Sequence, residues 1–169
     1  MVQKVSFEEL MFTAIDATQD TFSQLLGVDV LAGKVRKEME PINADVVGIV
    51  GIGWERVGYV IFSVDKNTAF LLASKLLGME PEDDMIIRDA VGELINIVAG
   101  TIKSKYERDY GSVGLGLPLI LSGTMIPCDK NILKEKQEEL PTVKVQSKSV
   151  LIPFKSFDID ISFYVMIYM

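Results

Sequence analysis

Three segments of the chain carry apolar residues at helical spacing. They run from Ser6 to Gly27, from Asp65 to Gly78, and from about Asp83 to about Arg108. Recurrence at steps of three and four residues is typical of helices with one buried face. Ser6 and Glu9 have the spacing of a capping box, and the glycines at 27 and 78 suit helix ends. The sequence therefore predicts a helix over each segment.

Apolar runs between and after these segments predict strands. Glycine and apolar residues alternate from Gly48 to Gly58, which favours a hairpin of two strands, Asp45–Gly53 and Glu55–Val64, with a tight turn at Gly53–Arg56. These glycines lack the spacing of a dinucleotide-binding loop. "LILSGTMIP", "SVLIPFKS" and "FDIDISFYVMIYM" should form the remaining strands. In the last segment, every second residue from Phe157 to Ile167 is apolar, so we expect a strand over the whole segment.

The order of elements is helix, strands, helix, helix, strands, which favours an α+β fold with an antiparallel sheet packed against long helices. A length of 169 residues suits a single domain over residues 1–169. "DATQDTFSQLLG" from Asp16 and "DAVGELINIVAG" from Asp89 share the pattern D-A-x-x-acid-x-x-polar-x-x-x-G. The pattern predicts two loosely repeated helix–strand halves, and a chance match over so short a segment is the alternative.

Composition excludes several classes of function. The net charge is -7 and the pI about 4.7, which argues against nucleic acid and anionic membranes as partners, since both need a basic face. The longest uncharged run, 110–128, is interrupted by glycine and proline, so no membrane-spanning helix is expected there. The first ten residues contain acids where a signal peptide is apolar. We expect a cytoplasmic protein.

The residue inventory restricts the chemistry further. The chain has no histidine and a single cysteine, which excludes histidine-based catalysis, histidine metal ligands, an internal disulfide and a cysteine-bound zinc. Glu82, Asp83 and Asp84 could serve metal-dependent hydrolysis, but they are adjacent rather than convergent, and we expect them to favour the start of a helix. No metal site and no cofactor of its own are expected. Chemistry must come from carboxylates, amides, hydroxyls or a partner.

One predicted helix carries an unusual polar line. In "RDAVGELINIVAG", Asp89, Glu93 and Asn96 lie within about 60° of one another on the helix surface. Gly100 and Lys103 continue this line. A solvated helix face is the alternative interpretation, but such a face normally carries better helix formers than asparagine and glycine.

Two small residues, Gly92 and Ala99, flank the polar line. Because they carry little or no side chain, we expect another surface to approach the helix backbone closely beside them.

These residues resemble a known signature. Asp89-x3-Glu93-x2-Asn96, followed after 21 residues by Pro118, is similar to the motif of the CheC/CheX/FliY phosphatases of bacterial chemotaxis. "VGELINIVAG", "LPLILSG", "VVGIVGIGWERVGYVIFSVDKNTA" and "FDIDISF" resemble further segments of this family, so the likeness extends over most of the chain. Only one full motif is present, which resembles CheX rather than CheC.

The resemblance implies a CheC-like fold and hydrolysis of the aspartyl phosphate of a CheY-like response regulator. Glu93 and Asn96 would be catalytic: Glu93 would pair with a cation of the regulator, its active-site lysine, and Asn96 would hold the attacking water. Asp89 would be a secondary contact. The Mg²⁺ and the acceptor aspartate would belong to the regulator.

Other residues would form the contact surface for the regulator. Gly92 and Ala99 would let the helix enter the regulator's active site, and Gly100 and Lys103 would extend the contact. Pro118 would begin the strand beside the helix and fix its approach; an ordinary loop proline is the alternative.

Several expectations concern partners. A non-catalytic binding or assembly module for a response regulator or the flagellar switch is the alternative function, although the presence of both Glu93 and Asn96 argues against it. Response regulators are commonly acidic, so long-range attraction would not help and we expect a short-lived complex. The resemblance implies a homodimer, and "FDIDISFYVMIYM" as an exposed edge strand would invite pairing.

The first predicted helix repeats the spacing of the polar line with Asp16, Asp20 and Ser23. Asp20 is shorter than glutamate, and a serine cannot span as an amide can. We interpret this helix as the remnant of a duplicated site, structural rather than active.

Overall fold

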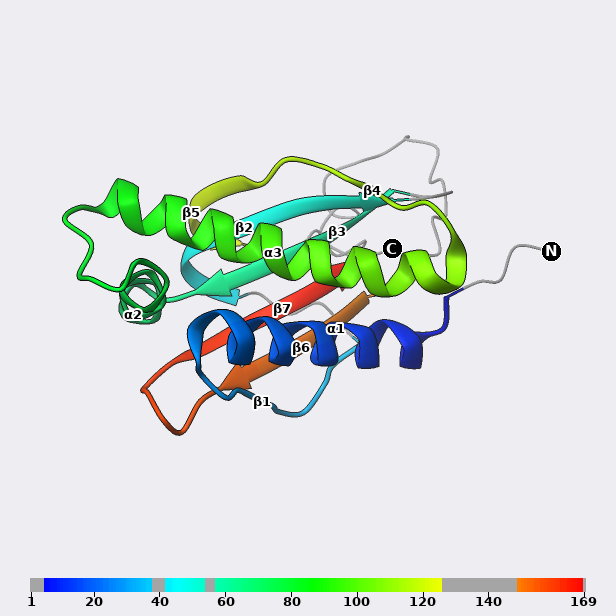
Figure 1. Ribbon diagram of the computed structural model, residues 1–169, viewed down its shortest axis with the longest axis horizontal. Coiled ribbons are helices and arrows are strands. Elements are labelled where there is room, and N and C mark those ends of the chain that lie inside the picture. Colours follow the sequence, from blue (N-terminus) through cyan, green and yellow to red (C-terminus); the bar gives the residue numbers. More distant parts are fainter. Residues whose placement is uncertain (1–4, 38–41, 54–56, 126–148, 169) are drawn as a thin grey trace, which may run out of the picture.

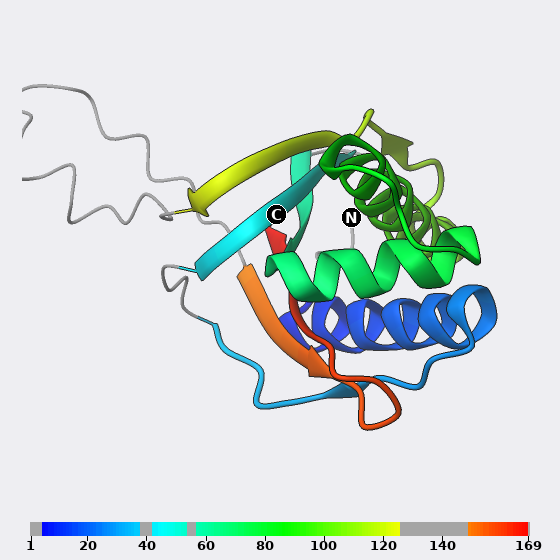
Figure 2. The same cartoon turned by 90° about the vertical axis from the view of Figure 1, so that its left-hand side faces the viewer.

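The computed structural model describes residues 5–37, 42–53, 57–125 and 149–168. These residues form two layers, with a seven-stranded sheet on one side and the helices α1, α2 and α3 against one face of it (Figures 1 and 2). All strand pairs are antiparallel. The predicted α+β class is therefore confirmed.

The helices begin and end close to their predicted limits. They are α1 (Phe7–Thr21), which continues directly into the π-helix η1 (Phe22–Leu26), α2 (Lys66–Leu77) and α3 (Asp84–Tyr110). The predicted capping box is present, since the Glu9 amide donates to Ser6 Oγ at 3.1 Å and the Ser6 amide donates to Glu9 Oε2 at 2.6 Å. Gly27 and Gly78 end η1 and α2 with φ of 62° and 71°, a left-handed conformation that favours glycine.

The sheet has the order β1-β6-β7-β3-β2-β4, and β5 also pairs with β2. The strands are β1 (Leu31–Ala32), β2 (Ile42–Gly53), β3 (Val57–Val64), β4 (Gly114–Leu115), β5 (Leu119–Met125), β6 (Ser149–Lys155) and β7 (Ser162–Tyr168). β2 and β3 form the predicted hairpin, although residues 54–56 of its turn lie outside the described residues. The polar segment from Cys128 to Lys148 also lies outside them.

The prediction for the segment from Phe157 onward is wrong in two respects. The strand β7 begins only at Ser162, and Phe157 is 78% exposed in the connection from β6. β7 is also not an edge strand, because it lies between β6 and β3 in the middle of the sheet. The apolar character that suggested an exposed edge belongs instead to a strand buried on both faces. The edge argument for a homodimer is therefore wrong, and the homodimer stays a prediction from the resemblance alone.

An aromatic cluster in the core joins η1 to the sheet. The ring of Phe22 stacks on that of Phe163 with centroids 4.6 Å apart, and Phe154 stacks on the same ring at 5.2 Å. Phe22 is fully buried. The π-helix is thus anchored by its buried first and last residues, Phe22 and Leu26, while the three residues between them are exposed.

Long α3 crosses the sheet over β2. A Cβ placed on Gly48 of β2 would lie only 2.8 Å from Cγ2 of Ile95, so the glycine allows helix and strand to approach closely. α3 also packs beside α1, and the two helices run next to each other over the sheet (Figure 1). No described helix is long and apolar enough to cross a membrane.

Candidate functional site

The acids before α3 start the helix. The Asp83 carboxylate accepts hydrogen bonds from the backbone N–H groups of Met85 at 2.8 Å and Ile86 at 2.9 Å, which satisfies two donors of the first turn. Asp84 forms an ion pair with Lys66 at 3.4 Å. This confirms the predicted helix-start role. In the part of the chain that the structure describes, no group of three histidine, cysteine, aspartate or glutamate residues could hold a metal ion.

The predicted polar line lies on the outer face of α3. Asp89 and Glu93 are exposed and Asn96 is half-buried, whereas Leu94, Ile95 and other apolar residues of α3 are buried beneath them. The side chains of Asp89, Glu93 and Asn96 form no hydrogen bond or ion pair with any described residue. Two carboxylates and an amide thus share one accessible helix face, free to bind an external group.

The structure contradicts the expected role of the two small residues beside this line. Gly92 is buried, and a Cβ placed on it would lie 3.2 Å from Cγ1 of Ile120 in β5. Ala99 is 0% exposed and belongs to the core. Both residues are small because α3 packs closely against its own sheet and core. A partner cannot approach the helix backbone at these two positions.

The other expected contact residues differ in accessibility. Gly100 is half-buried, and a Cβ there would meet open space. Lys103 is engaged internally by an ion pair with Glu107 at 3.0 Å. The Val113 amide donates to the Glu107 carboxylate, and this hydrogen bond together with Lys103 lowers the pKa of Glu107. Pro118 directly precedes β5, at the position predicted for it.

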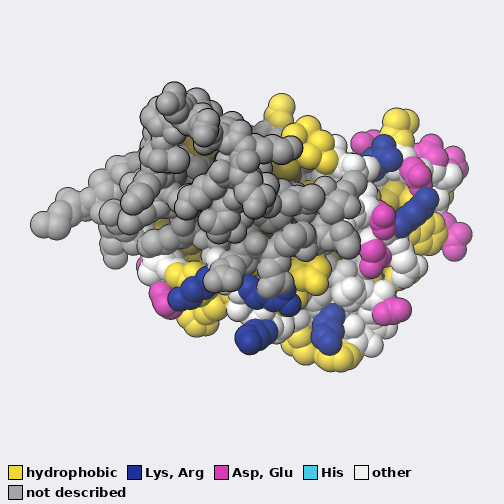
Figure 3. Space-filling model, turned by 180° about the vertical axis from the view of Figure 1, so that it is seen from behind, with side chains coloured by type: hydrophobic (Ala, Val, Ile, Leu, Met, Phe, Trp, Pro, Cys, Tyr) yellow, Lys and Arg dark blue, Asp and Glu magenta, His cyan; other side chains and the backbone are white. Residues whose placement is uncertain are grey.

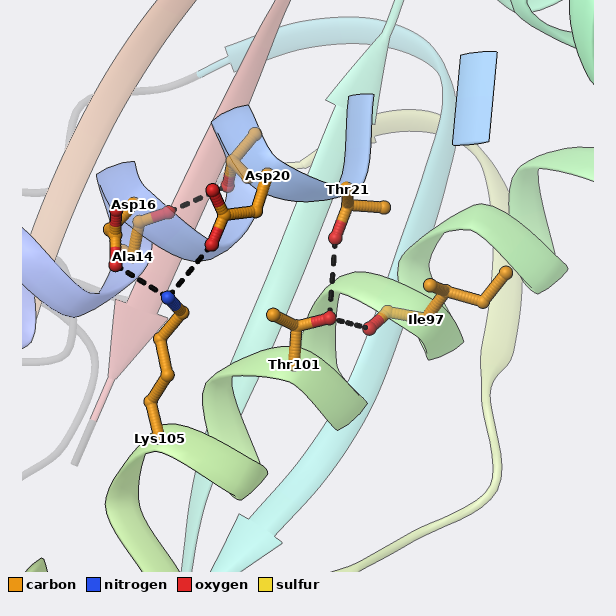
Figure 4. A network of polar contacts seen from close by, with 8 residues as sticks. Ala14, Asp16, Asp20, Thr21, Ile97, Thr101 and Lys105 are labelled. Carbon is orange, nitrogen blue, oxygen red and sulfur yellow. Dashed lines mark hydrogen bonds and ion pairs between the residues drawn. The ribbon is translucent and has the colours of Figure 1, made fainter. Parts of the chain in front are cut away.

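The corresponding residues of α1 are occupied by an ion pair. Lys105 of α3 contacts Asp16 at 2.5 Å and Asp20 at 2.9 Å (Figure 4). Hydrogen bonds to Asp16 and Asp20 raise the pKa of Lys105. This ion pair joins α1 to α3, which supports the interpretation that Asp16 and Asp20 have a structural role. That the first helix is inactive stays a prediction.

Sequence reasoning missed a groove beside the polar line. It has a volume of about 430 Å³ and lies between the end of α1, η1 and α3. Its floor contains a hydrogen bond between the hydroxyls of Thr21 and Thr101 at 3.3 Å (Figure 4). The α3 wall is formed by residues at steps of four and three, namely Ile97, Thr101, Ser104 and Arg108. That spacing was visible in the sequence, but nothing in the sequence showed that η1 would face it.

The charges on and before α3 are unevenly distributed along its length. Before and at its first turn lie Glu80, Glu82, Asp83 and Asp84, beside the exposed apolar residues Leu77, Met79 and Met85. Seen from behind, acidic side chains gather among hydrophobic ones at this end of the molecule (Figure 3). The first half of α3 carries one cation, Arg88, whereas the second half carries Lys103, Lys105 and Arg108 together with Glu107 and Asp109. The candidate site therefore lies between an acidic end and an end of mixed charge.

Comparisons with known proteins identify the family of the chain. The sequence model of the family described as "Chemotaxis phosphatase CheX" matches residues 46–155. The CheY-P phosphatase CheX of Thermotoga maritima is 30% identical over 112 residues, which cover 64% of this chain and 72% of the relative.

Solved structures share the fold. The chemotaxis protein CheX of Desulfovibrio desulfuricans superposes with a TM-score of 0.76 at 21% identity, over 94% of this chain and 97% of that one. The CheX of Borrelia burgdorferi, in a crystal structure of a complex with CheY, BeF3 and Mg²⁺, gives a TM-score of 0.69 at 22% identity, over 97% of both chains.

Proposed function

The chain belongs to the CheX family of chemotaxis phosphatases, and from this premise we propose that it hydrolyses the aspartyl phosphate of a CheY-like response regulator. The Thermotoga relative is a CheY-P phosphatase, and the Borrelia relative has been solved in complex with CheY. The observation that carries the proposal is the accessible pair of Glu93 and Asn96, one turn apart on α3 and without a partner among the described residues.

Asn96 acts on the attacking water. Its side-chain amide has both donors and an acceptor, so it can hold a water in line with the phosphorus. The water oxygen bonds to phosphorus, the bond between phosphorus and the aspartate oxygen breaks, and inorganic phosphate and a free carboxylate remain. An acyl phosphate is already activated, so positioning and electrostatics supply most of the catalysis.

Glu93 acts on binding. Its carboxylate pairs with a cation of the regulator, the active-site lysine, and this charge-assisted contact strengthens as docking removes water. Asp89 provides a secondary contact at the edge. The Mg²⁺ and the acceptor aspartate are the regulator's own, and this chain contributes no cofactor.

The test is phosphate release from a phosphorylated CheY-like regulator. Adding catalytic amounts of the protein should accelerate release well beyond the regulator's own rate. Folded Asn96→Ala protein serves as the matched control, because it keeps the surface and removes the amide. Binding without acceleration would reject the phosphatase and favour a binding or assembly module for the regulator or the flagellar switch.

The proposed active unit is a homodimer, an expectation that stands on the family resemblance. Light scattering at micromolar concentration should give twice the mass of one chain. A monomer under these conditions would contradict it.

A further inference from the structure

The groove between η1 and α3 adjoins the proposed catalytic residues. Ile97 in its wall follows Asn96 directly, and Thr101 in its floor follows Gly100 of the polar line. From Asn96 to Arg108 the helix rises about 18 Å. An interface of ordinary size buries about 800 Å² on each partner. One docked regulator can therefore contact both Asn96 and the far end of the groove.

The groove combines apolar, amide, hydroxyl and cationic groups with one carboxylate, that of Asp20, which is paired with Lys105. Leu25, which is 42% exposed, and the half-buried Ile97 provide apolar surface. Gln24, Thr101 and Ser104 add an amide and two hydroxyls. Such a mixture suits a peptide segment, which offers backbone groups as well as side chains.

The two cations of the groove are not equivalent. Lys105 is neutralised by the two aspartates of α1. Arg108 is exposed and forms no ion pair with any described residue. A guanidinium is always charged and binds a carboxylate with two parallel hydrogen bonds. The groove thus holds one available cation on a chain whose net charge is -7.

We propose that this groove binds a loop of the phosphorylated regulator that carries an acidic side chain beside an apolar one. The acid pairs with Arg108, and the apolar side chain packs on Leu25 and Ile97. The inference rests on the proposed function, because it assigns a second contact to the same partner.

Charge complementarity selects this occupant. Two acidic proteins repel at long range, so their complex depends on local cations. The opposite end of α3 carries Glu80, Glu82, Asp83 and Asp84, with Arg88 as the nearest cation of the helix. Beside Arg108 lie Asp109 and Glu107, and Glu107 is already paired with Lys103, so an acidic loop meets less repulsion there. The loop is therefore directed to the Arg108 end, which fixes the direction in which the regulator lies along α3.

The π-helix has a specific part in this surface. The buried Phe22 holds the start of η1 in the core, and Gly27 ends it, so Gln24 and Leu25 face the groove. π-helical turns are costly and occur frequently at functional sites. Here the turn places an exposed leucine opposite α3.

The first experiment measures phosphate release by the whole protein as a function of regulator concentration. Arg108→Gln should raise KM about 3- to 10-fold and leave kcat unchanged, as expected for a contact at the rim of an interface. Arg108→Lys should recover part of the loss. Lys34→Gln, an exposed charge beyond β1, removes the same charge on another part of the surface and should leave KM unchanged. The difference between Arg108→Gln and the unaltered protein should shrink with added salt.

The second experiment tests the apolar contact. Leu25→Ala should raise KM about 3-fold or more, since docking would bury the part of the leucine side chain that is exposed in the free protein. Leu31→Ala on β1, which is 52% exposed, is the matched control. Melting curves verify that all variants are folded.

The outcomes separate the two proposals. If the unaltered protein fails to accelerate release, the proposed function fails. If it accelerates release but Arg108→Gln and Leu25→Ala keep the original KM, the groove proposal alone is overturned. If Arg108→Gln and Lys34→Gln raised KM equally, Arg108 would act only through the net charge of the protein. That result would also overturn the groove proposal.

Discussion

The helices α1 and α3 carry acidic residues at the same spacing, but the two sets of acids differ in whether a cation pairs with them. On α1, Asp16 and Asp20 are held by Lys105. On α3, the matching Asp89 and Glu93 form no ion pair with any described residue. The same pattern is therefore internal structure on one helix and an accessible surface on the other.

The cause of the difference is the length of the two helices. The glycine that closes the shared pattern ends η1 at Gly27, whereas at Gly100 the helix α3 continues to Tyr110. This extension supplies Lys105, which reaches back to α1. α1 stops too early to supply an equivalent lysine for Asp89 and Glu93. A helix extension thus leaves the acids of α3 accessible and pairs those of α1.

The largest expected effect comes from removing the amide of α3. Asn96→Ala should lower turnover by about 10²-fold or more, the scale of losing one positioned group at a transition state. Ser23→Ala, its counterpart on η1, should leave turnover unchanged. Phosphate release at saturating regulator measures both, and binding of a regulator carrying a phosphoryl mimic should remain nearly normal. Full activity of folded Asn96→Ala would reject the mechanism.

Removing an acid should weaken binding on α3 but not on α1. Glu93→Ala should weaken binding by about 1.5–3 kcal/mol, the value of a hydrogen bond to a charged group. Asp20→Ala should not weaken binding; because it releases part of the Lys105 charge beside the groove, it should leave affinity equal or tighter. Titration of the phosphoryl-mimic regulator decides this, and similar losses in both variants would contradict the distinction between the helices.

The ion pair between the helices should contribute modestly to stability. Lys105→Met should lower the free energy of unfolding by less than about 1 kcal/mol, because the acids are largely exposed and screened. The corresponding change in Tm is at most about 4 °C for a chain of this size.

The pH dependence of that contribution has a defined sign. The pKa of Lys105 is raised in the folded protein above its ordinary value of 10.5. The contribution is therefore fully present below pH 10.5 and is lost as the pH rises through the folded pKa. Thermal melts of Lys105→Met and unaltered protein should converge on the alkaline side. A gap that stays constant there would assign the effect to packing of the lysine stem.

The smallest expected effect is a failed rescue. In an Asn96→Ala background, Asp20→Glu with Ser23→Asn rewrites the catalytic pair on the first helix but should not restore phosphate release. Lys105 would still form an ion pair with the acid at position 20. Residue 23 lies in a π-helix, in which the Gly27 amide donates to the Phe22 carbonyl, so its side chain points in another direction than it would in an α-helix. Recovery of turnover would show that α1 retains a usable site.

The sequence predicted what is local and missed what depends on tertiary contacts. Capping residues and left-handed glycines act within a few residues, so the limits of α1 and α2 followed from Ser6, Gly27 and Gly78. The exposed line of Asp89, Glu93 and Asn96 followed from helical periodicity alone. By contrast, the burial of Gly92 depends on its contact with Ile120 of β5. The spacing of residues in the sequence does not show which residue of the strand lies beside which residue of the helix.

The same limit explains the groove and the position of β7. The groove needs η1 to face α3, and the pairing of Asp16 and Asp20 with Lys105 joins residues far apart in the chain. An apolar strand can lie at an edge or in the middle of a sheet, and only its neighbours decide. For β7 those neighbours are β3 and β6.

The central position of β7 has a consequence for how the protein folds. β3 pairs on one side with β2 through a short hairpin, but on the other side Phe62 pairs with Val165. The chain between Phe62 and Val165 forms a long loop, and closing it costs entropy before the contacts form. Topologies with such long-range pairings fold slowly. The helices can form early, whereas the aromatic core around Phe163 must wait for β7. The amides that join β3 to β7 should therefore be among the last to gain protection from hydrogen exchange during refolding.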